Sequence, residues 1–78
     1  MILAVDIGNS NIVLGGIQED RIAFEARIRT DSTKISVEYC IDIKMLLDVY
    51  GFKRGDVEGA IISSVVPQVL NSIKTAIK

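Results

Sequence analysis

The hexapeptide DIGNSN, which begins at Asp6, combines the residue types that phosphate and metal chemistry uses. Asp6 is the one charged residue in a segment whose flanks, MILAV and IVLGGI, are apolar. A carboxylate in this place suits a hydrated Mg²⁺ ion, and Gly8 lets the backbone approach a ligand closely. Successive N–H groups in a turn can point together at an anion. The remaining members add side-chain donors: Asn9, Ser10 and Asn11. The motif therefore predicts a phosphate-binding hairpin with Asp6 at the metal.

A purely structural interpretation of the same motif stays open. Gly and Asn are common turn residues, and Asp6 would then accept hydrogen bonds from turn amides. Two other phosphate or metal motifs are excluded. The Gly-Lys-Ser/Thr of a P-loop does not follow, and the oxygen ligands of a calcium-binding EF-hand loop do not recur at the required spacing.

A second polar interruption occurs in AIISSVVP, where Ser63 and Ser64 precede Pro67. Strand ends in α/β sheets place polar groups near ligands, and a helix N-terminus favours anions. Serines also satisfy backbone groups where a strand passes into a helix, and this structural interpretation is the better supported one.

Several other polar or reactive residues have a structural or solvent-exposed role as the better explanation. An Arg near a strand end can bind phosphate, but a solvated strand face is the more frequent use. A cysteine on an apolar helix stripe is typically a structural thiol. The residues in question are Arg27, Arg29, Thr30 and Asp31 at a strand end, Cys40 on a helix, and Lys53 and Arg54 in a loop.

The elements that position these residues follow from apolar periodicity. The expected order is β-β-β-α-β-α, with a mixed sheet in which the fourth strand returns parallel to an earlier one. Continuous apolar character predicts a first strand covered on both faces. The QED tripeptide turns the chain between the second and third strands. The expected strands are 2–7, 11–17, 21–30 and 60–66, with one helix ending near Tyr50 and another starting at Pro67.

Side-chain faces can be assigned in the same way. Alternation in the third strand puts Ile22, Phe24, Ala26 and Ile28 on one face and the charged residues on the other. The polar TDSTK loop offers N-caps for the first helix, and Gly51 suits its left-handed C-cap. Gly15 and Gly16 indicate a bulge or a close backbone approach. The helix stripes are Tyr39, Cys40, Ile43, Leu46, Leu47 and Tyr50, then Val69, Leu70, Ile73, Ala76 and Ile77.

Composition narrows the class of protein. The 78 residues are 49% hydrophobic, which is more apolar surface than one small core needs, so we expect a partner surface. A net charge of −1 and 5% aromatic residues argue against nucleic acid. One cysteine and no histidine exclude a disulfide framework, a Cys/His zinc site and a His-activated nucleophile within one chain. No apolar run reaches the roughly 20 residues of a membrane span, and no signal peptide is recognisable, so a cytoplasmic protein is expected.

Taken together, MILAVDIGNSNIVLGG, ARIRT and AIISSVVP resemble the type III pantothenate kinases over all 78 residues. The D-x-G-N-[ST]-N and I-S-S-V-V-P elements occur in the order and at the separation that this family shows. The resemblance implies the actin-like ATPase (ribonuclease H-like) fold, of which this chain would be the first part. It also implies transfer of the ATP γ-phosphate to pantothenate, the first step of coenzyme A synthesis. The implied cofactors are Mg²⁺ and a monovalent cation, K⁺ or NH₄⁺, and the implied assembly is a homodimer.

Position by position, the resemblance assigns Asp6 to the metal–phosphate unit and Gly8, Asn9, Ser10 and Asn11 to the first phosphate-binding hairpin. The sequence has no Gly-x-Asp-Arg element, which supplies the base and the pantothenate site in the family. Residues 1–78 are therefore expected to be an incomplete N-terminal nucleotide-binding domain, without a catalytic residue and inactive alone. Self-association of such a piece is expected, because it lacks a closing strand.

Three alternatives stay open at this point. The chain belongs to another kinase or ATPase of the same superfamily, such as a sugar or acetate kinase; or it is a non-catalytic interaction module of the transcriptional accessory type; or it is a small α/β domain with a structural hairpin. Binding of Mg·ATP at the hairpin distinguishes the first from the last.

Overall fold

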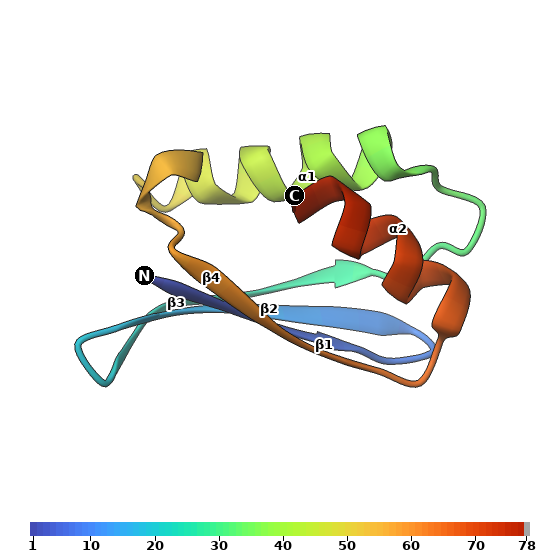
Figure 1. Ribbon diagram of the computed structural model, residues 1–78, viewed down its shortest axis with the longest axis horizontal. Helices are drawn as coiled ribbons and strands as arrows, with labels where there is room; N and C mark the ends of the chain where they lie inside the picture. Colours follow the sequence, from blue (N-terminus) through green and yellow to red (C-terminus); the bar gives the residue numbers. More distant parts are fainter. Residues whose placement is uncertain (78) are drawn as a thin grey trace.

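The chain folds into a mixed sheet with two helices on one face (Figure 1). This is seen in a computed structural model, which describes residues 1–77. This confirms the α/β class and the order β-β-β-α-β-α, to which the structure adds one short 3₁₀ helix. The elements are β1 (Ile2–Ile7), β2 (Asn11–Gln18), β3 (Arg21–Arg29), α1 (Ser36–Val49), η1 (Arg54–Asp56), β4 (Gly59–Ser64) and α2 (Pro67–Ile77).

The strand that carries Asp6 is internal to the sheet. The strand order is β3-β2-β1-β4, with β1 antiparallel to β2 and parallel to β4, as expected for a strand that returns through a helix. Hydrogen bonding on both sides fixes the position of β1, and Figure 1 shows the β1–β2 turn, the end of β3 and the start of α2 at the same end of the sheet.

The core lies between the sheet and the two helices. Every second residue of β1 is buried there, and the predicted stripes of α1 and α2 meet these side chains. The helix stripes are confirmed except at Tyr50, which is exposed although its ring stacks on Phe24 with 5.0 Å between the centroids. The most deeply buried side chains are Leu3, Ile7, Ile12, Leu14, Tyr39, Val69 and Ile73.

The expectation that β1 is covered on both faces is wrong for the described residues. Both α1 and α2 pack on the same face of the sheet (Figure 1), so Ala4 is only half-buried and Asp6 is exposed. We call the other side of the sheet the open face. It contains a hollow of about 320 Å³ lined by Ala4, Val5, Asp6, Val13, Gly15, Ile17, Ile22, Glu25, Ile61 and Ser63.

The placement of Ile22 on the same face as Phe24, Ala26 and Ile28 is also wrong, because β3 contains a bulge. Gly16 pairs with Phe24 but Ile17 pairs with Ile22, so Ala23 is an extra residue that reverses the alternation. Ile22 therefore lies on the open face and is 68% exposed. The predicted role of Gly16 is confirmed, since a Cβ there would overlap the ring of Phe24.

The helix ends agree only in part with expectation. Gly51 has φ of +81° after the C-cap of α1, and Pro67 begins α2, both as predicted. The N-cap of α1 is Ile35 rather than a polar residue of the TDSTK loop, and the Glu38 carboxylate accepts the Ile35 N–H at 3.2 Å. Among residues 1–77, no helix has both the length and the apolar character needed to cross a bilayer.

We predict that Asp20→Gly stabilises the protein. Glu19 and Asp20 form the two-residue β2–β3 loop with φ of 53° and 61°, a conformation that a Cβ disfavours. Relief of this cost should add about 0.5 kcal/mol, or about 2–4 °C in Tm, in thermal and urea unfolding followed by circular dichroism. Asp20→Ala is the control, because it removes the charge but keeps the Cβ. An equal gain in both variants would contradict the backbone explanation.

Candidate phosphate-binding site

The predicted hairpin is present as a tight, exposed turn. Gly8 N–H donates to the Asn11 carbonyl at 2.9 Å, and residues 9 and 10 form a bend between β1 and β2. The side chains of Asn9, Ser10 and Asn11 are exposed, so their polar groups are accessible to a ligand. A Cβ on Gly8 would lie 3.1 Å from the Asn11 carbonyl oxygen. Glycine is therefore favoured here, because a Cβ would fit only if the Asn11 carbonyl moved by a few tenths of an ångström.

Asp6 lies on the open face, beside the turn rather than inside it. Because side chains alternate along a strand, burial of Ile7 in the core directs Asp6 to the opposite side. Its cross-strand neighbours are Val13 on β2 and Ser63 on β4. The Asp6 side chain is exposed, which leaves its carboxylate accessible from the open face.

A magnesium ion fits this arrangement better than a metal bound by protein ligands alone. Within the part of the chain that the structure describes, His, Cys, Asp and Glu do not gather in groups of three that could hold a metal. Mg²⁺ keeps several waters and is typically held by one or two carboxylates together with substrate phosphates. A single exposed carboxylate, Asp6, next to a turn rich in donors is compatible with that mode of binding.

One basic side chain shares the row of Asp6 across the open face. The register places Asp6 opposite Val13, and Val13 opposite Arg27. Strands lie about 4.8 Å apart, so the backbones of Asp6 and Arg27 are about 10 Å apart. Arg27 is exposed, as a solvated strand face predicts, and it lies on the same face as the carboxylate.

The two serines of β4 have different surroundings. The Ser64 hydroxyl donates to the Val66 carbonyl at 3.0 Å, and its oxygen accepts the Val66 N–H at 2.9 Å. The structural interpretation of Ser64 is thus confirmed. Ser63 is exposed on the open face opposite Asp6, a neighbour that the sequence alone did not identify.

Thr30 holds the turn, which sequence analysis missed. Its N–H donates to the Ser10 carbonyl at 3.0 Å and its Oγ1 donates to the Gly8 carbonyl at 2.8 Å. The sequence signal was available only as a threonine directly after the last residue of β3. Its distance of 22 positions from Gly8 concealed the contact.

Asp31, which follows Thr30, is used locally. The Thr33 hydroxyl and the Thr33 N–H, the latter at 2.9 Å, both donate to its Oδ1. These hydrogen bonds, with a smaller contribution from the charge of Lys34, hold the pKa of the Asp31 carboxyl below its ordinary value. The Asp31 carboxylate thus shapes the loop before α1.

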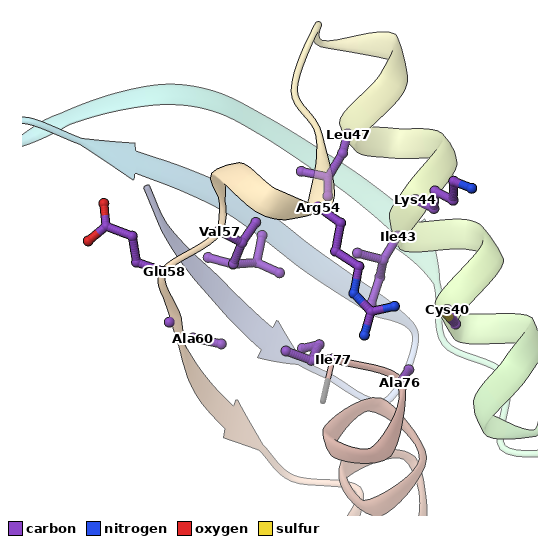
Figure 2. A pocket seen from close by; sticks show the side chains of 12 residues that line it. Cys40, Ile43, Lys44, Leu47, Arg54, Val57, Glu58, Ala60, Ala76 and Ile77 are labelled. Atoms are coloured by element: carbon purple, nitrogen blue, oxygen red, sulfur yellow. The ribbon is translucent and has the colours of Figure 1, made fainter.

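A second hollow, of about 210 Å³, lies away from the turn (Figure 2). Its walls come from α1, η1, the end of α2 and the starts of β1 and β4, whereas the turn follows the end of β1. Figure 2 shows the Arg54 side chain extending from η1 between α1 and α2. Cys40, predicted to be a buried structural thiol, is half-buried and lines this hollow.

The topology and the site together define a class of protein. A β-β-β-α-β-α unit with a mixed sheet, an acidic residue near the end of the first strand and a Gly-Asn-Ser turn after it forms the first part of an actin-like ATPase fold. The sequence profile of one family with this fold, the type III pantothenate kinases, matches residues 2–78. The chain belongs to that family.

Individual relatives agree with the family match. A type III pantothenate kinase of Finegoldia magna is 45% identical over 78 residues, which are 100% of this chain and 30% of that protein. One of Syntrophobacter fumaroxidans is 51% identical over 74 residues, covering 95% of this chain and 29% of the relative. One of Bifidobacterium adolescentis is 46% identical over 77 residues, which cover 99% of this chain and 30% of the relative. The chain thus spans about 30% of the length of these relatives.

We predict that Gly8→Ala distorts the turn. The added Cβ must displace the Asn11 carbonyl, which accepts the Gly8 N–H, so we expect a loss of about 1 kcal/mol in unfolding free energy. Amide chemical shifts should change at residues 8–11. Gly55→Ala is the matched control, since a Cβ there meets nothing within 4 Å and Gly55 is not at positive φ. Equal effects of the two substitutions would contradict a steric requirement at Gly8.

Proposed function

We propose that this chain is part of an enzyme that phosphorylates pantothenate with ATP, giving 4'-phosphopantothenate in the first step of coenzyme A biosynthesis. The observation that carries the proposal is the pairing of Asp6 with an exposed donor-rich turn on an internal strand, in a chain that belongs to the type III pantothenate kinase family. In this proposal, the chain contributes the first phosphate-binding hairpin.

The residues of the hairpin have separate roles in this proposal. Mg²⁺ neutralises charge on the ATP phosphates. Asp6 holds that ion, directly or through its water, because its carboxylate is exposed beside the turn. Asn9, Ser10 and Asn11, with the backbone N–H groups of the turn, donate hydrogen bonds to phosphate oxygens. Their task is to bind and orient ATP, since phosphoryl transfer depends chiefly on positioning and electrostatic stabilisation.

We further propose that residues 1–78 form an incomplete nucleotide-binding domain. The hairpin offers no acceptor site for pantothenate and no general base, and the relatives are more than three times as long as this chain. The chain alone should therefore bind ATP weakly and not turn over substrate. Cytoplasmic location and use of a monovalent cation, K⁺ or NH₄⁺, are parts of the same proposal and remain predictions.

The alternative functions are no longer equally supported. The family match favours pantothenate kinase over a sugar kinase, an acetate kinase or another actin-like ATPase. A non-catalytic interaction module of the transcriptional accessory type, or a structural turn, would leave the hairpin without ATP. Nucleotide binding at the turn is therefore the property to measure.

We predict that Mg·ATP shifts the amide resonances of residues 6–13 in the 78-residue chain. In KCl buffer, Asp6→Asn should weaken this binding about tenfold, because the substitution removes the charge that holds the metal. Asp48→Asn is the matched control, as Asp48 is exposed on α1 and lies outside the hairpin. The measurement is a titration followed by ¹H–¹⁵N correlation spectra. No shift at millimolar Mg·ATP, or equal weakening in both variants, would contradict the assignment.

A coupled assay with ATP and pantothenate should show no turnover by the 78-residue chain. Turnover would contradict the proposal that the domain is incomplete.

We also propose that this chain self-associates through the outer edge of β4. Within residues 1–77, no strand pairs with that edge, and β4 contains neither a charge nor a proline. The other sheet edge, β3, contains a bulge and four charged residues, Arg21, Glu25, Arg27 and Arg29. Both features disfavour pairing with another strand. A second copy fits the β4 edge, because an uncharged strand can pair with itself about a twofold axis without repulsion.

We predict that the 78-residue chain shows concentration-dependent association in sedimentation equilibrium and that Ile61→Lys reduces it. Ile61 is 65% exposed on β4, so a lysine there should not disturb the core but should place like charges at the strand pair. Ile22→Lys is the control, because Ile22 is similarly exposed on the open face but belongs to β3. A monomer at all concentrations, or equal effects of both variants, would contradict association through β4.

A further inference from the structure

One residue of the neighbouring chain segment, Thr30, holds two carbonyl groups of the β1–β2 turn. Thr30 Oγ1 donates to the Gly8 carbonyl at 2.8 Å, and Thr30 N–H donates to the Ser10 carbonyl at 3.0 Å. In an ordinary two-residue hairpin, the Gly8 carbonyl would be satisfied by the first residue of the second strand. Here residues 9 and 10 form a bend instead of a hydrogen-bonded turn.

This pair of bonds sets the direction of two N–H groups. In a trans peptide, the N–H points opposite to the carbonyl of the same planar unit. The structure has no cis peptide bond among its described residues. The carbonyls of Gly8 and Ser10 point at Thr30, so the N–H groups of Asn9 and Asn11 point away from it. Thr30 thereby fixes the side of the turn on which these donors are presented.

Thr30 is itself anchored to the core through its neighbour. The Tyr39 hydroxyl donates to the Asp31 carbonyl at 2.6 Å and accepts the Asp31 N–H at 3.1 Å. The Tyr39 side chain is 0% exposed and belongs to the buried stripe of α1. Lys34 lies over its ring, 5.5 Å from the centroid. The link from the core to the turn thus runs from Tyr39 through the Asp31 backbone to Thr30.

We infer that Thr30 is a positioning residue for phosphate binding: its hydroxyl holds the turn, before any nucleotide arrives, in the conformation that presents the Asn9 and Asn11 N–H groups to an anion. The binding role rests on the proposed function, whereas the holding of the turn does not. Preorganised donors raise affinity because less ordering remains to be done on binding. Thr30 makes no contact with ATP in this scheme and acts only through the turn.

The hydroxyl can be tested separately from the shape of the side chain. Thr30→Val keeps the branched shape and the backbone N–H, but removes the donor to Gly8. Thr30→Ser keeps the donor. Thr75→Val is the matched control, because Thr75 Oγ1 also donates to a backbone carbonyl, that of Asn71, at 3.0 Å, but on the exposed side of α2 and far from the turn in sequence. All three variants are compared with the unaltered 78-residue chain.

Two measurements on the same samples separate the turn from the ligand. Without nucleotide, amide hydrogen exchange at Gly8, whose N–H donates to the Asn11 carbonyl across the turn, should become about fivefold faster in Thr30→Val and stay near the unaltered rate in Thr30→Ser and Thr75→Val. With Mg·ATP, the dissociation constant from the titration should rise about fivefold in Thr30→Val alone. The melting temperature reports global stability, and exchange at Leu3 and Leu14 reports any general loosening of the sheet.

Each outcome decides the inference. Unchanged exchange at the turn in Thr30→Val, or equal acceleration at Leu3 and Leu14, overturns it. Faster exchange confined to the turn together with weaker binding, both restored by serine, supports it. Faster exchange at the turn with unchanged ATP affinity overturns the positioning role. If the unaltered chain binds no Mg·ATP, the proposed function fails, and the exchange data alone then support or overturn the holding of the turn by Thr30.

Discussion

The alternation of side chains along β1 is the constraint on which the rest of the structure depends. Met1, Leu3, Val5 and Ile7 are at most 5% exposed, because they form the side of the core that faces α1 and α2. A shift of one residue would expose all of them, so the facing of this strand is strongly specified. Burial of Val5 and Ile7 leaves only one direction for Asp6. The position of the carboxylate thus follows from the packing of its neighbours, and its exposure carries no burial cost.

The turn after β1 depends on the same core by a second route. β1 brings the chain to Gly8 from one side, and Thr30 approaches from the end of β3 on the other. The meander makes this possible, because β2 lies between β1 and β3 and the pairing of Asn11 with Arg29 brings Thr30 level with Ser10. The Tyr39 hydroxyl then fixes the backbone just beyond β3. The exposed turn is therefore held on one side by β1, which packs into the core, and on the other by Thr30, whose neighbour Asp31 is hydrogen-bonded to the buried Tyr39.

Local rules explain what could be predicted from the sequence. The strand and helix periods identified the six principal elements, Gly51 and Pro67 marked helix ends, and the mixture of Asp6, glycine and amides indicated the candidate site. The errors arose where distant parts of the chain decide. Ala23 is a bulge because Phe24 must cover Gly16 on another strand, and a period of two cannot anticipate an extra residue. Thr30 was interpreted as part of a solvated strand end because its partner Gly8 lies 22 residues earlier. The side of the sheet on which α2 packs is likewise a tertiary property.

The open face connects the apolar composition to the chemistry of the site. The excess of hydrophobic residues is concentrated in part on this face, where Ile22 and Ile61 are 68% and 65% exposed. Ala4 and Gly15 lie between Ile61 and Glu25 in the register, and their small size leaves the hollow in which a covering side chain would fit. Asp6 borders that same hollow. A layer that covers the apolar part of the face would lower the local dielectric constant around the carboxylate and strengthen its attraction for a cation. If Asp6 holds the metal–phosphate unit as we propose, closing the sheet and binding that unit are coupled through one surface, and a chain with this face uncovered should bind the unit less tightly than one in which it is covered.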